Sequence, residues 1–203
     1  MPLGIPGPRA LRTQLADTVR AIADTNRAGQ AYGFLAITPI KPGHAEALRA
    51  LLATIDAGPS PFSRLPRTHF ARWVVLTDFF TGDAYQPADE DHLGCEYLIF
   101  SACFDGDRDS YLEDLTAEIA DELDEIYDHC IGVRSNDPTD VARYLVHNQI
   151  DCGLFYSAYP HTTVAEVRRV VAQRTALRAL AVAQYDLTPE ELQAQFVDQL
   201  GAA

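Results

Sequence analysis

Two residues near the middle of the chain carry side chains suited to catalysis. His69 and Arg72 lie three positions apart in the segment HFARWVVLTD, which is rich in aromatic and β-branched residues and predicts a strand over 69–78. Because side chains alternate along a strand, we expect the two residues to lie on opposite faces of a sheet. His69 is either a base, a metal ligand or a haem ligand, or a structural histidine held by hydrogen bonds.

Arg72 needs an anionic partner. Its expected face also carries Phe70 and Val74, and an unpaired guanidinium is costly among apolar side chains. Asp105, or an acid on the helix that follows it, would supply the partner within the chain. A substrate carboxylate or a haem propionate is the functional alternative. Asp105 is in turn a candidate to orient a substrate or to accept a proton.

The three alternating acids from Asp105 to Asp109 have the spacing with which a calcium loop begins. The rest of such a loop is absent, because position six is Ser110 instead of Gly and position twelve is Thr116 instead of Glu. Carboxylates before a helix cap free amides and favour the helix dipole. We therefore interpret these acids as a helix start, with a capping box from Ser110 to Glu113.

Four further residues are candidates for holding a cofactor. His129 follows the long helix predicted below and His161 follows the last predicted strand, so both lie in loops, where function concentrates. The alternative for each is an ordinary surface histidine. Trp73 and Tyr156 belong to predicted strands, and aromatic side chains on the inner face of a sheet either enclose a flat ligand or fill the core.

The apolar pattern predicts the elements that position these residues. The order of the elements is typical of an α+β fold with a single ferredoxin-like, split βαβ antiparallel sheet and additional N- and C-terminal helices. Helical spacing predicts helices over 11–22, 45–55, 111–126, 141–147 and 164–177, and a capped helix start at 188–191. Alternating or β-branched runs predict strands over 32–40, 69–78, 96–104 and 153–159.

The same order divides the chain into three predicted parts: an N-terminal helical extension (1–31), a ferredoxin-like α+β domain (32–180) and a C-terminal helical extension (181–203). The strand over 69–78 is apolar on both faces, although a half-exposed antiparallel sheet normally turns one polar face to water. Either the terminal helices or the sheet of another subunit must cover the second face. We expect a homodimer.

Three segments resemble a known group of proteins: LPRTHFARWVVL, EYLIFSACFDGDRDSYLEDL and GLFYSAYPHTTVAEVRR. In this order they are similar to uncharacterised bacterial proteins with the dimeric α+β barrel fold, across residues 32–175. More distantly, this superfamily includes chlorite dismutases, dye-decolourising peroxidases, haem-degrading monooxygenases and cofactor-free monooxygenases of polyketide rings. The resemblance implies a fold more firmly than an activity, because the same sheet hosts unrelated chemistries.

One shorter match concerns the peroxidases. Residues 102–106, ACFDG, resemble the GxxDG motif of dye-decolourising peroxidases, in which the aspartate helps to cleave bound peroxide. The resemblance thus implies a catalytic role for Asp105, and haem as the cofactor. The leading glycine of the motif is Ala102 in this chain, and those enzymes use two ferredoxin-like modules where this chain has length for one.

The distribution of charge argues against two classes of partner. Sixteen of the 29 acidic residues lie between Asp83 and Asp128, a stretch in which Arg108 is the one basic residue. Nucleic acids and anionic membranes are bound by clusters of Lys and Arg, so we expect neither as a partner. No apolar run is long enough to cross a membrane, and the four scattered cysteines are typical of free thiols. We expect a cytoplasmic protein.

Two functions fit these expectations. The first is a peroxidase- or monooxygenase-like oxidoreductase, with or without haem, that acts on a small apolar or aromatic molecule in a pocket beside the sheet. His69, Arg72 and Asp105 would then converge on the substrate. The second is a non-catalytic module that binds a small molecule or another protein. It predicts that His69 and Arg72 are held by structural partners.

Overall fold

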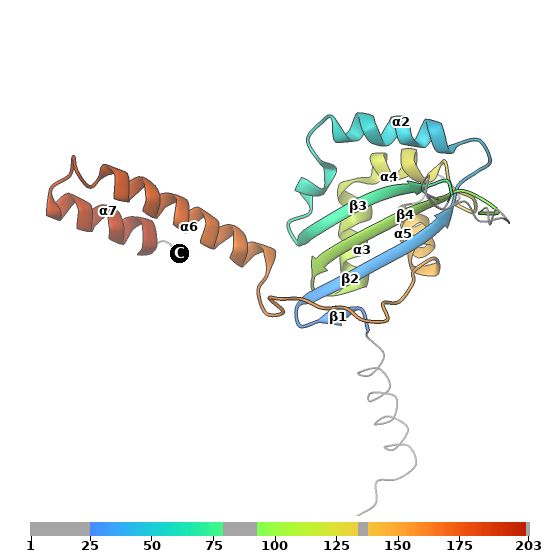
Figure 1. Cartoon of the computed structure of the whole chain (residues 1–203). Coiled ribbons are helices and arrows are strands. Elements are labelled where there is room, and N and C mark those ends of the chain that lie inside the picture. The colour runs from blue at the N-terminus through green and yellow to red at the C-terminus, as the bar shows by residue number, and fades with distance from the viewer. Residues whose placement is uncertain (1–24, 79–92, 134–137, 202–203) are drawn as a thin grey trace, which may run out of the picture.

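A four-stranded antiparallel sheet lies at the centre of the molecule (Figure 1). The computed structural model describes residues 25–78, 93–133 and 138–201. Three of the predicted strands are confirmed within two residues at each end, because their β-branched and aromatic side chains suit a pleated surface. From one edge to the other, the strands are β1 (Arg27–Ala28), β2 (Ala31–Pro39), β4 (Tyr97–Asp105) and β3 (Thr68–Leu76).

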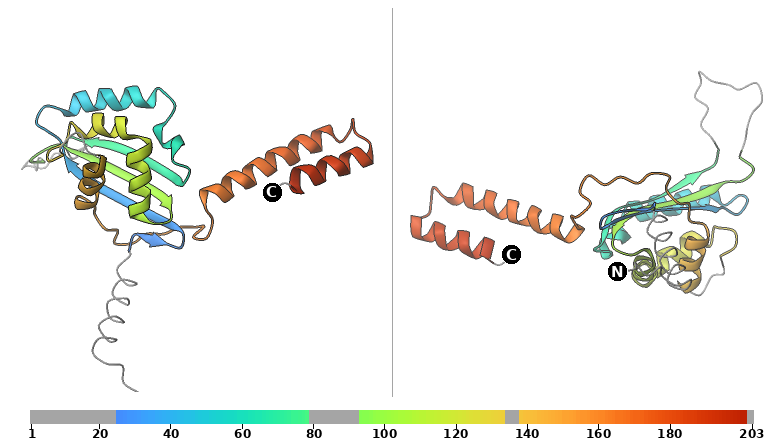
Figure 2. Two further views of the ribbon diagram at one scale, coloured as in Figure 1. Left: turned by 180° about the vertical axis from the view of Figure 1, so that it is seen from behind. Right: turned by 90° about the horizontal axis from the view of Figure 1, so that it is seen from below.

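Helices pack against one face of this sheet and share one core with it (Figure 2). Alternate residues of the strands, among them Phe34, Phe100 and Phe104, point into that core and are almost completely buried. The helices predicted over 45–55 and 141–147 are confirmed. The elements on this side are α2 (Ala45–Asp56), the short 3-10 helix η1 (Pro61–Arg64), α3 (Arg108–Glu118), α4 (Ala120–Tyr127) and α5 (Pro138–His147).

The single long helix predicted over 111–126 is wrong, because the chain breaks it into α3 and α4. The break falls at Ile119, whose backbone leaves the helical region with φ −129° and ψ 37°. Leu115, Ile119 and Leu123 are nevertheless all buried in the same core. The change of direction therefore keeps the apolar side chains of both helices in that core, which a helical pattern in the sequence does not reveal.

The opposite face of the sheet, here called the open face, carries the side chains that alternate with the core residues. The strand register places Ile37, Ile99 and Val74 in one row across this face, and Leu35, Ser101 and Arg72 in the next. Val74, on the edge strand β3, is 40% exposed. In the described part of the chain, the helices of the core lie on the other side of the sheet (Figure 2).

The C-terminal helices form a hairpin that projects away from the sheet, as Figures 1 and 2 show. We call α6 (Val164–Ala183) and α7 (Pro189–Gly201) the arm. A capping box between Thr163 and Glu166 starts α6, and Thr188 caps α7 as predicted. The predicted boundary between 180 and 181 falls inside α6. In the described ranges, no helix combines the length and apolar character needed to span a membrane.

The fourth strand predicted over 153–159 is wrong, because this segment has no regular secondary structure. The outer edge of β2 is instead paired by the short β1 and by a single bridge from Gln149 to Ala36. The chain is thus shown to be a mixed α+β protein with an antiparallel sheet, while a complete ferredoxin-like sheet is not confirmed. The helix predicted over 11–22 lies outside the described residues.

Candidate functional site

The last residue of β4, Asp105, joins three segments that lie far apart in the sequence. Its Oδ1 atom lies 2.7 Å from His69 Nε2, and its Oδ2 atom accepts a hydrogen bond of 2.7 Å from the backbone N–H of Val164. Because a carboxylate only accepts, His69 Nε2 carries the proton in this contact. Asp105 is buried, and both of its oxygens are used by the chain itself.

A β-bulge brings His69 to this junction. The pairing of β3 with β4 shifts its register between Thr68 and Phe70, so His69 is the extra residue of β3. The strict alternation expected from His69 to Arg72 is therefore interrupted at the bulge. A bulge of one residue does not change the hydrophobic pattern of the strand visibly. The spacing of the residues therefore could not predict the contact between His69 and Asp105.

The ionisable groups next to this junction are held in their protonated forms. Burial, followed by the charge of Asp105, raises the pKa of the Cys103 thiol. Burial likewise raises the pKa of Tyr111 to about 12, and its hydroxyl lies 2.9 Å from Thr68 Oγ1. Neither group is therefore a ready nucleophile or base at neutral pH. The junction fits a structural tie between β3, β4 and α6 better than a proton-transfer site.

Arg72 lies apart from the junction, at the rim of a groove of about 390 Å³ between β3, α2 and η1. The sequence suggested Asp105 or an acid of the next helix as its partner, and Asp105 is wrong because that carboxylate binds His69 and Val164 instead. Within the described residues, Arg72 makes no hydrogen bond or ion pair. The guanidinium is exposed, so water solvates it and the expected cost of an unpaired buried charge does not arise.

Trp73 belongs to the core. Its ring lies 4.7 Å from that of Phe62 and 5.5 Å from that of Phe100, measured between centroids. Its indole Nε1 and the hydroxyl of Tyr127 are both buried and interact with one another, but neither makes a hydrogen bond of regular geometry among the described residues. Burial also raises the pKa of Tyr127 far above its ordinary value. Trp73 thus fills the sheet interior, which is the simpler of the two roles expected for it.

His129 makes a contact at the opposite end of β2 from Asp105. Its Nδ1 atom lies 3.1 Å from Nδ1 of His44, the residue that precedes α2. Burial, then the nearby His44, lowers the pKa of His129. At this distance one imidazole N–H donates a hydrogen bond to the other ring, provided that at least one of the two rings is neutral. Among the described residues, no group of three or more His, Cys, Asp or Glu side chains is arranged to hold a metal ion.

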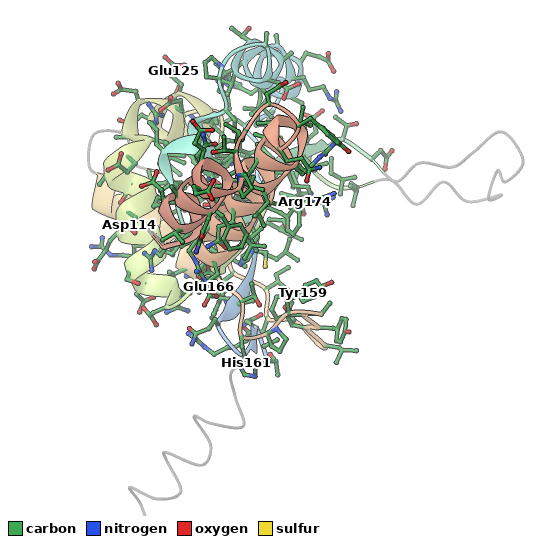
Figure 3. The ribbon with its side chains drawn as sticks, turned by 90° about the vertical axis from the view of Figure 1, so that its left-hand side faces the viewer. Asp114, Glu125, Tyr159, His161, Glu166 and Arg174 are labelled. Carbon is green, nitrogen blue, oxygen red and sulfur yellow. The ribbon has the colours of Figure 1, made fainter. Side chains whose placement is uncertain are left out.

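The remaining cofactor candidates are not brought together. Tyr156 is 80% exposed and His161 is exposed too, in the segment that leads into the arm. Figure 3, which looks along the arm, shows Tyr159 and His161 in that segment. Trp73 lies in the core and His129 at the far end of β2. These residues do not line one cavity for a haem, so we derive no chemical step through that group.

Helix capping, expected for the acids after β4, is confirmed, although the capping residue differs. Asp107 is the N-cap of α3, and its side chain accepts hydrogen bonds from the backbone N–H groups of Asp109 and Ser110. The capping box predicted from Ser110 to Glu113 is wrong, because Ser110 already lies inside the helix and donates to the Asp107 carbonyl. The sequence located the helix start three residues too late.

Two contacts in the segment after α5 were missed by the sequence reasoning. The ring of Phe155 lies so close above Gly33 that a Cβ atom there would be 2.8 Å from it. The buried Asn26 donates to Asp151 Oδ1 and accepts from the backbone N–H of Cys152. A glycine inside a strand often marks a close approach, so Gly33 was the one available signal. Asn26 carried none.

Comparison of the chain with protein-family models, with curated proteins and with solved structures finds no match.

Proposed function

We propose that this protein is a non-catalytic interaction module, and that the open face of its sheet binds a second copy of the chain. The observation that carries the proposal is the apolar character of a sheet face that no helix in the described residues covers. Antiparallel sheets that face water usually alternate apolar and polar residues. Here Leu35, Ile37, Ile99 and Val74 take the places where polar residues are expected.

The chemistry of the ionisable residues supports binding over catalysis. His69 and Asp105 are bonded to one another, and Asp105 also holds the start of α6. Arg72 stands apart from them at a separate groove and has no partner among the described residues, although a non-catalytic module predicts a structural partner for it. An oxidoreductase of the kind considered above needs these three groups to converge on one substrate, and the geometry gives no support to that convergence.

The second copy fits the open face because the central rows of this face carry little charge. Arg72 is the one charged residue in its central rows, so two such faces meet with little repulsion. Three nine-residue strands, at about 3.3 Å per residue and about 4.8 Å apart, span roughly 450 Å², of which the end at Gly33 is already covered by Phe155 of the same chain. A standard interface buries about 800 Å² per partner, so the open face supplies a substantial part of one.

A charge placed on the open face tests the proposal. We expect Val74→Glu to reduce the average molar mass in sedimentation equilibrium, because a carboxylate in the middle of an apolar interface loses its water. Ile131→Glu is the matched control, since Ile131 is 45% exposed, close to the 40% of Val74, but lies outside the open face. Equal masses for Val74→Glu, Ile131→Glu and the unmodified chain would contradict the proposal.

The absence of haem chemistry is tested separately. Because the candidate ligands are scattered, we expect that adding haem to the purified chain gives no stoichiometric absorption band near about 400 nm. A stoichiometric band that His69→Ala or His161→Ala removes would instead support the oxidoreductase.

A further inference from the structure

The arm exposes more apolar surface than a solvated helical hairpin normally does. Val170 of α6 is 55% exposed and Phe196 of α7 is 47% exposed, and further valines of both helices are exposed beside them. Among the described side chains of the arm, only Val164 at its base and Leu180 between the helices are buried. A helix normally covers its apolar stripe with a neighbouring element. Most of this stripe has no such neighbour.

The arm does not cover its own body. Its first residue, Val164, is tied to Asp105 at the end of β4, and α6 runs away from the sheet from that point (Figure 1). The contacts of α7 are mainly with α6. The exposed stripe is therefore free to meet a partner.

Two apolar grooves mark where further helices fit. A groove of about 500 Å³ lies between α6 and α7, with Leu180 and Phe196 in its walls. A second, of about 350 Å³, lies along α6 beside Val170 and Arg174. Leu177 lines both, so the two grooves are continuous. Helices pair by seating the side-chain ridges of one in the grooves of the other. The groove between α6 and α7 is lined mainly by apolar residues, whereas the groove along α6 also has Gln173, Arg174 and Arg178 in its walls.

The two helices of the arm carry opposite charges. Helix α6 has four arginines and one glutamate. Helix α7 has three acidic residues, Glu190, Glu191 and Asp198, and no lysine or arginine. Arg174 makes no ion pair within the described residues, although it lies in the groove beside Val170 and Leu177. A surface with one basic and one acidic helix is complementary to a copy of itself turned by a twofold axis.

We propose that the arm binds the arm of a second copy, so that two α6–α7 hairpins form an antiparallel four-helix bundle. In this bundle α6 of each chain lies against α7 of the other, which places the arginines opposite the acids and closes both grooves. The twenty residues of α6 span about 30 Å at 1.5 Å per residue. Because the thirteen residues of α7 span about 20 Å, the two helices, each about 10 Å wide, present roughly 500 Å², which is more than half of the 800 Å² per partner of a standard interface.

This inference goes beyond the proposed function and does not rest on it, because the arm and the open face are separate surfaces. The two interfaces act either between the same two chains or between different pairs. In both cases the loss of one leaves the other intact, so they can be tested independently.

A charge in the groove tests the bundle. Val170→Glu is expected to weaken association of the full chain at least about tenfold in sedimentation equilibrium, because it replaces an apolar contact by a carboxylate that the partner's helix would bury. Val182→Glu is the matched control, since Val182 is an exposed valine of the same helix that lines neither groove. Both variants keep the helical signal in circular dichroism. Equal association constants for Val170→Glu, Val182→Glu and the unmodified chain would overturn the inference.

A reversal of charge tests the pairing of α6 with α7. Arg174→Glu is expected to weaken association and to reverse its salt dependence, because a carboxylate then faces the acidic helix of the partner. Thr175→Glu, on the next exposed residue of α6 and outside both grooves, is the control and is expected to leave the association constant unchanged. An Arg174→Glu variant that associates as tightly as the unmodified chain would contradict the bundle.

A double variant separates the bundle from the main competing arrangement, in which the arm of one copy lies on the open face of another. Val74→Glu and Val170→Glu act on different interfaces in the bundle, so their effects on the free energy of association add. In the competing arrangement both substitutions lie in one shared interface. The double variant then loses little more free energy of association than either single variant. Additive effects support the bundle, and strongly non-additive effects overturn it.

Discussion

The carboxylate of Asp105 connects the bulged strand β3, the end of β4 and the first turn of the arm. Its two oxygens receive the His69 imidazole and the Val164 amide, and all three groups are largely shielded from water. A buried donor that loses its acceptor keeps the full cost of its desolvation. Asp105 is therefore expected to matter for stability and for the anchoring of α6, more than for any reaction.

Asp105→Ala is expected to lower the free energy of unfolding by about 1–3 kcal/mol, because it leaves the Val164 amide and His69 without an acceptor. Urea denaturation followed by circular dichroism measures this change. Asp186→Ala is the control, since Asp186 is exposed in the turn between α6 and α7. An Asp105→Ala protein as stable as the control would show that the junction holds nothing together.

The contact between His129 and His44 predicts a dependence of stability on pH. The pKa of His129 is lowered in the folded protein by burial and by His44, against the smaller opposing effect of Asp128. Lys41 also faces this group and lowers the pKa. Between the lowered pKa and the ordinary value near 6.5, the unfolded chain binds more protons than the folded chain. The stabilising contribution is therefore complete above that ordinary value and is lost as the pH falls through the window.

We expect the unmodified chain to lose more stability than His129→Gln when the pH is lowered from about 8 to about 5.5. The measurement is the midpoint of urea denaturation at both pH values. Because His129 is only partly buried, the expected difference is small and its sign is the test. A larger loss in His129→Gln would contradict the assigned direction of the pKa shift.

At the scale of residues, the sequence predicted chemical types but not contacts. The sequence named His69, Arg72 and Asp105 as catalytic candidates with structural alternatives, and Trp73 as a core or ligand-facing aromatic. The partners of His69 and Arg72 could not be predicted. The bulge brings His69 to Asp105, and Arg72 is exposed, so water solvates its guanidinium in place of a protein partner. Spacing along one chain reports the face of a residue only while the strand stays regular.

At the scale of elements, the irregular segment that follows α5 is held to the sheet by a contact that only glycine permits. Phe155 occupies the space above Gly33 that a side chain would fill. Gly33→Ala is expected to push Phe155 off the sheet and to lower the free energy of unfolding by about 1–3 kcal/mol. Urea denaturation measures the loss, and limited proteolysis between 151 and 160 reports the release of the segment.

Gly153→Ala is the matched control for this change. Gly153 belongs to the same segment, and a Cβ atom there would meet nothing within 4 Å. We expect Gly153→Ala to be neutral or slightly stabilising, because it restricts the unfolded chain without a clash. If Gly33→Ala is equally neutral, Phe155 does not anchor the segment.

The elements with a strong periodic pattern were predicted well, and those fixed by contacts were not. Strands β2, β3 and β4 and helices α2, α5, α6 and α7 follow from β-branched runs, helical spacing and capping residues. The break at Ile119 and the irregular backbone over 153–159 depend on how the core closes. An aromatic run such as LFYSAY favours a strand locally, but the outer edge of β2 is already paired by β1 and by Gln149.

At the scale of the whole molecule, the acidic charge and the apolar surface lie on different parts. Helices α3 and α4 carry eight acidic residues, among them Asp114 and Glu125, which Figure 3 shows on the helical side of the body. Arg64 and Arg67 pair with two of these acids. The exposed apolar residues lie mainly on the arm, on the segment between α5 and α6, and at Phe70 and Val74 of β3. The apolar surfaces on the open face and on the arm are the basis for the proposed self-association.

The most direct test of this account is the molar mass of the unmodified chain in solution, measured by light scattering across a dilution series. The account predicts a multiple of the 22.4 kDa chain at high concentration, which falls toward 22.4 kDa on dilution as the open faces and arms separate. A mass of 22.4 kDa at every concentration would contradict the central claim, because both apolar surfaces would then be exposed without a second copy to cover them.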